Sequence, residues 1–178
     1  MNYLWTCLLA LLLVTSGCSN DDNLIQNPEV KSFDSKQFGF TFQYPLDWSE
    51  RIQDLPNNWA ISRGQDTIIF MVRGSDKIDL LELGKRQAMS DTIGNSSAVV
   101  SKEVAEQVYG MVTLTNFNDQ QWYTYAIEFK GESVDSIISG TLCGSHEILM
   151  VLVSSIATYD QNKETYTKLL ESFTCNLQ

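Results

Sequence analysis

Hydrophobic and polar residues alternate along several short stretches of the chain, and the first clear one, FTFQYP, begins at Phe40. Phe40, Phe42 and Tyr44 are separated by single polar residues, which is the period of a half-buried β-strand. Pro45 cannot donate a backbone hydrogen bond and therefore ends the strand. Trp48 follows after a short gap, and the chain then continues in extended form. We expect these aromatic residues to be core residues.

The middle of the chain contains a hairpin pattern and a helical pattern. Two short runs, NNWAISR and TIIFMVR, are separated by GQD and predict a β-hairpin. From Lys77, apolar residues recur at helical spacing through KIDLLELGKRQAMSD, which predicts an amphipathic helix with Gly84 as its weak point. Four further strands are expected in SSAVVSKEV, YGMVTLTNFN, QWYTYAIEFK and VDSIISGTLC.

The last part of the chain contains a strand and a helix. The stretch EILMVLVSSI is apolar on both faces, which indicates a central, covered strand. In YDQNKETYTKLLESF, one helical stripe contains Tyr159, Tyr166, Leu169, Leu170 and Phe173. Two helices and about seven strands, mostly joined as hairpins, predict an α+β domain. The simplest arrangement is a mostly antiparallel β-sheet covered by helices.

The first residues differ from the rest. The apolar run from Tyr3 to Val14 has about twelve residues, whereas a helix needs about twenty to cross a bilayer. It predicts a signal peptide over residues 1–17. The small residues directly before Cys18, in VTSGC, resemble the lipobox of bacterial lipoproteins. That resemblance implies cleavage before Cys18 and lipid attachment to its thiol, with fatty acids such as palmitate.

The lipobox resemblance also sets the expected organisation and location. Residues 18–35 would form a flexible tether and residues 36–178 the folded domain. The protein would be exported and anchored to a bacterial membrane through Cys18, and Ser19 favours the outer membrane if the source is Gram-negative. Two alternatives remain open, a secreted protein whose signal ends in cysteine and a short uncleaved anchor.

The net charge and the cysteine content lead to two further expectations, one about binding partners and one about a disulfide. The formal net charge is -10 and no run of Lys or Arg is present, so nucleic acid is not an expected partner. Cys7 lies in the predicted signal peptide and Cys18 would carry the lipid, so two cysteines remain for a disulfide, Cys143 and Cys175. The strand after Cys143 leads away and the terminal helix returns, so the two ends should meet. We expect a disulfide in an oxidising compartment, with two buried free thiols as the alternative.

The aromatic strand, the YP pair and the following tryptophan resemble the opening of the PsbP-like family. The order of later elements and the closing LLESF are also similar, and the likeness covers residues 33–173. This family includes the PsbP subunit of photosystem II, bacterial lipoproteins and the Ran-binding Mog proteins. The resemblance implies an α/β/α sandwich and a non-catalytic role.

Two functional hypotheses follow. The first is a lipid-anchored binding or assembly module of the cell envelope, with a protein partner held at a sheet edge or at a face near Trp59, Trp122 and Tyr123. The second is an exported hydrolase or metal-dependent enzyme that uses His146, the single histidine, paired with Cys143. The sequence contains no phosphate loop, dinucleotide fingerprint or complete metal-ligand motif, so we expect no catalytic residue, metal or cofactor.

Overall fold

The computed structural model of the chain describes residues 29–51, 57–75, 79–93, 102–128 and 133–176. The predicted signal peptide and Cys18 lie outside these residues. The described part contains three helices and ten strands. The helices are α1 (Leu80–Ile93), α2 (Lys102–Met111) and α3 (Tyr159–Ser172). The strands are β1 (Val30–Ser35), β2 (Phe40–Pro45), β3 (Ser49–Arg51), β4 (Asn58–Arg63), β5 (Asp66–Gly74), β6 (Thr113–Phe117), β7 (Gln120–Glu128), β8 (Val134–Cys143), β9 (His146–Ser155) and β10 (Thr174–Cys175).

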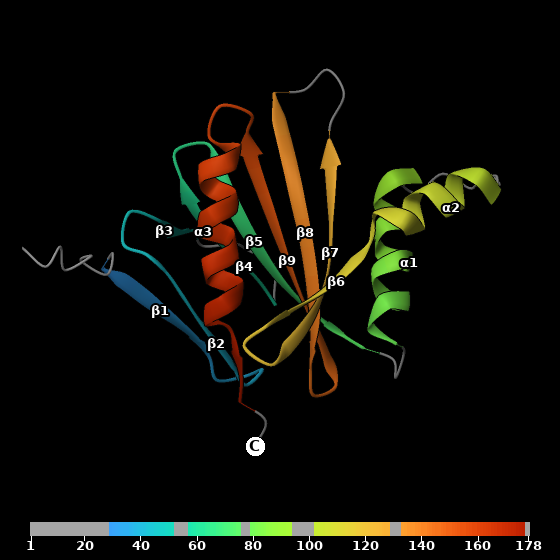
Figure 1. The fold of residues 1–178 in the computed structure, drawn as a ribbon. Coiled ribbons are helices and arrows are strands. Elements are labelled where there is room, and N and C mark those ends of the chain that lie inside the picture. The colour runs from blue at the N-terminus through green and yellow to red at the C-terminus, as the bar shows by residue number, and fades with distance from the viewer. Residues whose placement is uncertain (1–28, 52–56, 76–78, 94–101, 129–132, 177–178) are drawn as a thin grey trace, which may run out of the picture.

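The strands form two sheets (Figure 1). Seven antiparallel strands make the larger sheet in the order β3-β4-β5-β9-β8-β7-β6, and three make the smaller one in the order β1-β2-β10. β9 is the middle strand of the larger sheet, so the expectation from its apolar faces is confirmed. The β4–β5 hairpin turns at Gly64, whose φ of 63° is a conformation that glycine adopts without strain.

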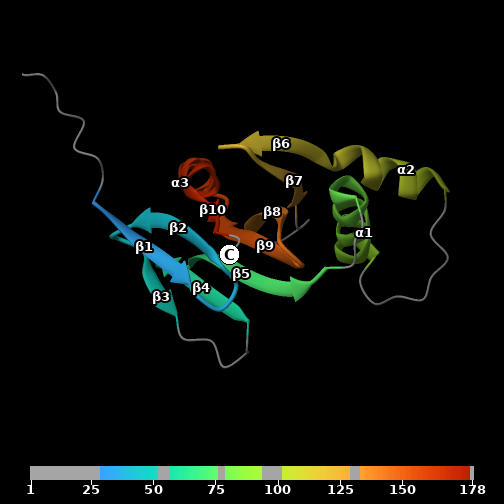
Figure 2. The same cartoon turned by 90° about the horizontal axis from the view of Figure 1, so that it is seen from below.

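Helices cover both faces of the larger sheet (Figure 2). α3 and the small sheet lie on one face, whereas α1 lies on the other with α2 beside it. The α3 face is packed around aromatic residues, and the α1 face has a smaller core. The α3-side core includes Phe40, Phe42, Trp48, Phe70, Trp122 and Phe173. The expected α+β sandwich is therefore confirmed, and so is the core position of Trp48, which is completely buried.

The structure differs from the sequence expectation in two elements. Residues 30–35, assigned to the tether, form β1, which pairs antiparallel with β2 along its whole length. Phe33 stacks on Phe42 at a ring-centroid distance of 4.8 Å, which anchors this strand to the core. Residues 102–104 and 109–111, expected to belong to two strands, instead form the two ends of the helix α2, because Val104, Val108 and Met111 follow helical spacing.

Candidate functional site

The disulfide expected from the sequence is present. Cys143 at the end of β8 and Cys175 in β10 are joined with a Cα–Cα distance of 5.6 Å. The bond connects the β8–β9 hairpin of the large sheet to the small sheet, because β10 pairs with β2. It therefore fixes the end of the chain after α3 against the rest of the domain.

His146 lies beside this bond but has no nucleophile there. The sulfur of Cys143 is bonded to Cys175, so it cannot form the thiolate that a Cys143–His146 dyad requires. The imidazole packs edge-on against the ring of Phe38 at a centroid distance of 5.2 Å. An open cavity of about 770 Å³ borders His146, and its lining includes Lys36 and Asn176. Within the described residues, no three His, Cys, Asp or Glu side chains gather as a metal site.

The aromatic face expected to contact a partner belongs instead to the core. Trp122 and Tyr123 are both completely buried. Trp122 packs edge-on against Phe173 at 5.0 Å, on the α3 side of the sheet. Trp59 is partly buried and packs against Phe33 at 5.6 Å. The prediction that these three side chains form a binding face is wrong, because alternation along β7 places Trp122 and Tyr123 on opposite faces of the sheet and both faces are covered there.

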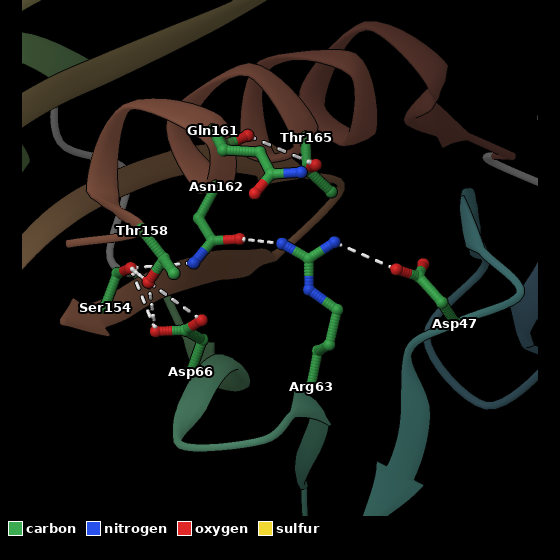
Figure 3. A network of polar contacts seen from close by, with 8 residues as sticks. All are labelled: Asp47, Arg63, Asp66, Ser154, Thr158, Gln161, Asn162 and Thr165. Atoms are coloured by element: carbon green, nitrogen blue, oxygen red, sulfur yellow. Dashed lines mark hydrogen bonds and ion pairs between the residues drawn. The ribbon is translucent and has the colours of Figure 1, made fainter.

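A polar network on the α3 side is centred on the buried Asp66 (Figure 3). Its carboxylate accepts hydrogen bonds from the Thr158 hydroxyl at 2.9 Å and the Ser154 hydroxyl at 3.1 Å. It also accepts one from the Ser155 backbone N–H at 3.0 Å. Burial alone would raise the pKa of Asp66, but these hydrogen bonds and one from Asn162 outweigh it and hold the pKa below its ordinary value. Asp66 is therefore an ionised anchor for the start of α3.

Arg63 extends the network toward the loop after β2. Its guanidinium donates to Asn162 at 2.6 Å and to Asp47 at 2.9 Å, and it lies 5.4 Å from the ring of Trp48. Asn162 is completely buried and donates to the Ser154 hydroxyl at 2.8 Å. These side chains satisfy one another (Figure 3). The network therefore locks α3 to the β4–β5 hairpin and is a structural feature rather than a ligand site.

The α1 face of the large sheet contains a groove that the sequence analysis did not identify. The groove has a volume of about 320 Å³ and lies across β5, β9, β8 and β7, beside α1. Its floor is apolar and includes the partly buried side chains of Met71, Ile127 and Val151. The available signal was that β5 and β9 are apolar on both faces. That pattern indicates cover on both sides, whereas α1 covers only part of this face.

One wall of the groove is polar. The Arg73 guanidinium donates to the side-chain oxygen of Gln87 at 2.7 Å, and the Gln87 amide donates to Asp91 at 2.9 Å. The hydroxyl of Tyr125 donates to the other carboxylate oxygen of Asp91. Arg73 comes from β5 and the two acceptors come from α1, so the wall also ties the helix to the sheet. The groove thus offers an apolar floor with charged and amide groups along one side.

Buried tyrosines support the helix beside the groove. Tyr123 lies under α1 and donates its hydroxyl to the buried Glu147 at 2.6 Å. Burial raises the pKa of Tyr123, and the carboxylate of Glu147 raises it further. The pKa of Tyr125 is raised by burial and then by Asp91. Both phenols are therefore neutral hydrogen-bond donors at physiological pH.

No helix among the described residues is long and apolar enough to cross a membrane. This statement does not extend to the apolar run at residues 3–14, because those residues lie outside the described part.

Comparison with known proteins identifies the fold. The sequence matches no family model and no curated protein. Several solved structures are similar, and three of them each cover 83% of this chain. Cyanobacterial PsbP from Synechocystis is 14% identical with a TM-score of 0.58 over 93% of its length. A protein from Bacteroides thetaiotaomicron is 11% identical with a TM-score of 0.55, and this chain spans 49% of it. The Ran-binding protein Mog1p of Saccharomyces cerevisiae is 9% identical with a TM-score of 0.49 over 95% of its length. The resemblance predicted from the sequence is thus confirmed at the level of the fold, and the chain has a PsbP-like fold.

Proposed function

We propose that this protein is a lipid-anchored, non-catalytic binding module of the cell envelope that holds a partner protein in the groove on the α1 face. The groove is the observation that carries the proposal. Its floor lies on central strands of the large sheet, which are held on both sides by hydrogen-bonded neighbours. A site on such strands is preorganised, so little conformational entropy is lost when a partner binds.

The chemistry of the groove favours a partner that presents apolar side chains beside a polar group. Met71, Ile127 and Val151 would lose their remaining contact with water under such a partner, which is favourable in proportion to the apolar area buried. Arg73 and Asp91 on the wall would select partner groups by charge and hydrogen bonding. The groove is short, so it accepts a few side chains rather than a whole domain.

The expected anchor limits where the partner can be. The segment from Cys18 to Val30 has about twelve residues, and a chain of that length reaches at most about 40 Å when fully extended. A domain attached in this way stays near one membrane surface. The proposed partner is therefore a membrane protein or another anchored protein of the envelope.

A charged substitution on the groove floor tests the binding role. Val151→Lys places an ammonium among apolar groups of the groove, and we expect capture of the partner to fall by at least about tenfold. Full-length protein would be cross-linked in its native membrane, and the cross-linked chains quantified by mass spectrometry. Gln161→Lys adds the same charge at an exposed position of α3 and should leave capture unchanged. Thermal unfolding of both variants checks that the fold is intact.

One result would contradict the proposed binding site. Retention of the same cross-linked partner by Val151→Lys would exclude the groove as its binding site.

Anchoring is tested separately by mass spectrometry of the membrane-derived protein, which should show a diacylglyceryl group on an amino-terminal Cys18. Cys18→Ser should release the protein or leave it unprocessed, and a mature protein that starts at another residue would contradict the anchor.

A further inference from the structure

The two edges of the large sheet differ in how they are protected. β3 at one edge has three residues and includes the charged pair Glu50 and Arg51. Short length and charge are the usual features that prevent an edge strand from pairing with another chain. β6 at the other edge has five residues, TLTNF, with neither charge nor proline. Its register with β7 is continuous from Thr113 to Phe117, so no bulge interrupts it.

β6 is also exposed on its surface. The first four of its residues are exposed and only Phe117 is partly buried against the core. Leu114 is 40% exposed, and Tyr109 and Met111 at the end of α2 are 40% and 46% exposed. Figure 2 shows β6 along the outside of the molecule, between α2 and α3. An uncharged edge therefore adjoins large apolar side chains that face water.

The turn after β6 determines which backbone groups face outward. Asn118 and Asp119 have φ values of 45° and 66°, the left-handed pair of a two-residue type I′ turn. Such a turn closes on a hydrogen-bonded pair, here Phe117 and Gln120, and hydrogen-bonded and non-hydrogen-bonded pairs alternate from there. The N–H and C=O groups of Leu114 and Asn116 consequently point away from β7.

The hairpin that carries this edge is fixed to the body of the protein. The side-chain amide of Asn118 donates to the carbonyl oxygen of Glu171 at the end of α3. The side-chain amide of Gln120 donates to the carbonyl oxygen of Leu142 at 3.1 Å. A strand held at its tip in this way presents its free edge in one conformation, which lowers the entropic cost of pairing.

Charge distinguishes between possible occupants. Asp119 lies at the tip of the hairpin and Glu171 lies next to it, in a chain whose net charge is -10. Pairing with a second copy of the chain would bring acidic surfaces together. A segment with basic residues beside its extended stretch complements them.

We propose that β6 is a docking edge at which an extended segment of a partner protein, uncharged in its middle and basic at the end that lies beside Asp119 and Glu171, adds a further strand to the large sheet. The outward N–H and C=O groups of Leu114 and Asn116 form the new ladder. A side chain of the segment that lies beside Leu114 should be apolar, because the side chain of Leu114 is itself 40% exposed and would be covered. This surface is independent of the groove, so the failure of either proposal leaves the other unaffected.

A peptide probe and amide hydrogen exchange test the docking edge. The probe is a capped peptide of about seven alternating Thr and Val residues with Lys at each end, chosen for its preference for extended structure. It would be titrated to about 1 mM into the full-length protein, a limit that detects even weak binding. We expect saturable binding and slower exchange of the Leu114 and Asn116 amide protons. The same peptide with Glu at its ends should bind at least about tenfold more weakly.

Two variants of one residue separate backbone pairing from side-chain contact. Asn116→Pro removes an outward N–H without removing a β6–β7 hydrogen bond, so it should abolish the protection while unfolding stays cooperative. Asn116→Ala keeps the N–H and should bind the probe like the original protein. Leu114→Lys, at an exposed position, is a second test that keeps the ladder and should weaken binding of the Lys-ended probe.

Three results would overturn the proposal. The first is the absence of saturable protection by the Lys-ended probe. The second is equal binding by Asn116→Pro and Asn116→Ala, which would show that the outward N–H is not used. The third is a dimer, measured by sedimentation without peptide, in which the same two amides are already protected, because the edge would then be occupied by a second copy.

Discussion

The close approach of α1 to the large sheet at Gly84 gives a prediction whose sign opposes the helix propensity. A Cβ atom at Gly84 would lie 2.7 Å from Cγ and 2.8 Å from Cβ of Tyr123, and 2.9 Å from Cγ1 of Val112. Carbon atoms in contact are ordinarily about 3.5 to 4 Å apart. The Tyr123 ring is also restrained at its other end, because its hydroxyl is bonded to Glu147 and it lies against Gly140. Gly84→Ala therefore requires α1 to move away from the sheet.

The expected change in the free energy of unfolding combines one stabilising and two destabilising contributions. Alanine stabilises a helix interior by about 1 kcal/mol relative to glycine. Overpacking of a filled core costs about 1 to 3 kcal/mol, and loss of the Tyr123–Glu147 hydrogen bond would add about 1.5 to 3 kcal/mol. Together these contributions should lower the free energy of unfolding of Gly84→Ala by about 1.5 to 5 kcal/mol. Gly110 in α2 is the matched control, because a Cβ there meets no atom within 4 Å. Gly110→Ala should raise stability by about 0.5 to 1 kcal/mol.

Urea unfolding followed by tryptophan fluorescence measures both variants in the full-length protein. The two midpoints should lie on opposite sides of the midpoint of the original protein. If both alanines stabilise the protein equally, α1 does not lie in contact with Tyr123 and the packing described for this face is wrong.

Three further predictions concern ionisation and the disulfide. Because the pKa of Asp66 is lowered in the folded state, its contribution to stability is present above about pH 4 and is lost as the pH falls through the folded-state pKa. Asp66→Asn should cost about 2 kcal/mol of unfolding free energy near neutral pH. The variant should also lose less stability than the original protein as the pH falls, measured by urea unfolding at each pH. The raised pKa values of Tyr123 and Tyr125 favour the folded state below about pH 10, and this contribution is lost at higher pH. The absorbance of their phenolates should therefore appear together with unfolding. Ionisation of both near pH 10 in the folded protein would contradict their burial. Thiol counting in denaturant should find Cys143 and Cys175 oxidised, and replacing both by serine should cost about 3 to 4 kcal/mol for a sequence separation of 32 residues.

Elements with strong local periodicity could be predicted from the sequence. The alternation in β2, the doubly apolar β9 and the stripe of α3 each indicate both the type of element and how it is covered. The disulfide could be predicted for a related reason, because the lengths of β9 and α3 determine where the chain returns after Cys143. These features depend on stretches of chain whose own pattern contains the information.

Features that depend on long-range pairing could not be predicted. β1 contains one large aromatic residue, Phe33, and becomes a strand because β2 pairs with it residue by residue. Gly84 looks like a weak point of a helix, yet it is the position where that helix lies closest to Tyr123. The groove follows from where α1 crosses the sheet, which no local pattern specifies. The sequence analysis also predicted a binding face that includes Trp122, but the side chain of Trp122 is completely buried.

The two faces of the large sheet are covered to different extents. The α3 face is closed by the aromatic core, by the network around Asp66 and by the disulfide, which together fix both ends of α3. The α1 face is closed by a smaller core in which α1 and α2 pack around Tyr123, and it leaves Met71 and Val151 partly exposed beside polar groups. A folded domain gains stability by covering such side chains, so leaving them open is a cost that binding can offset. Substitutions on the α3 face should therefore reduce stability first, whereas substitutions on the groove floor should reduce partner binding first.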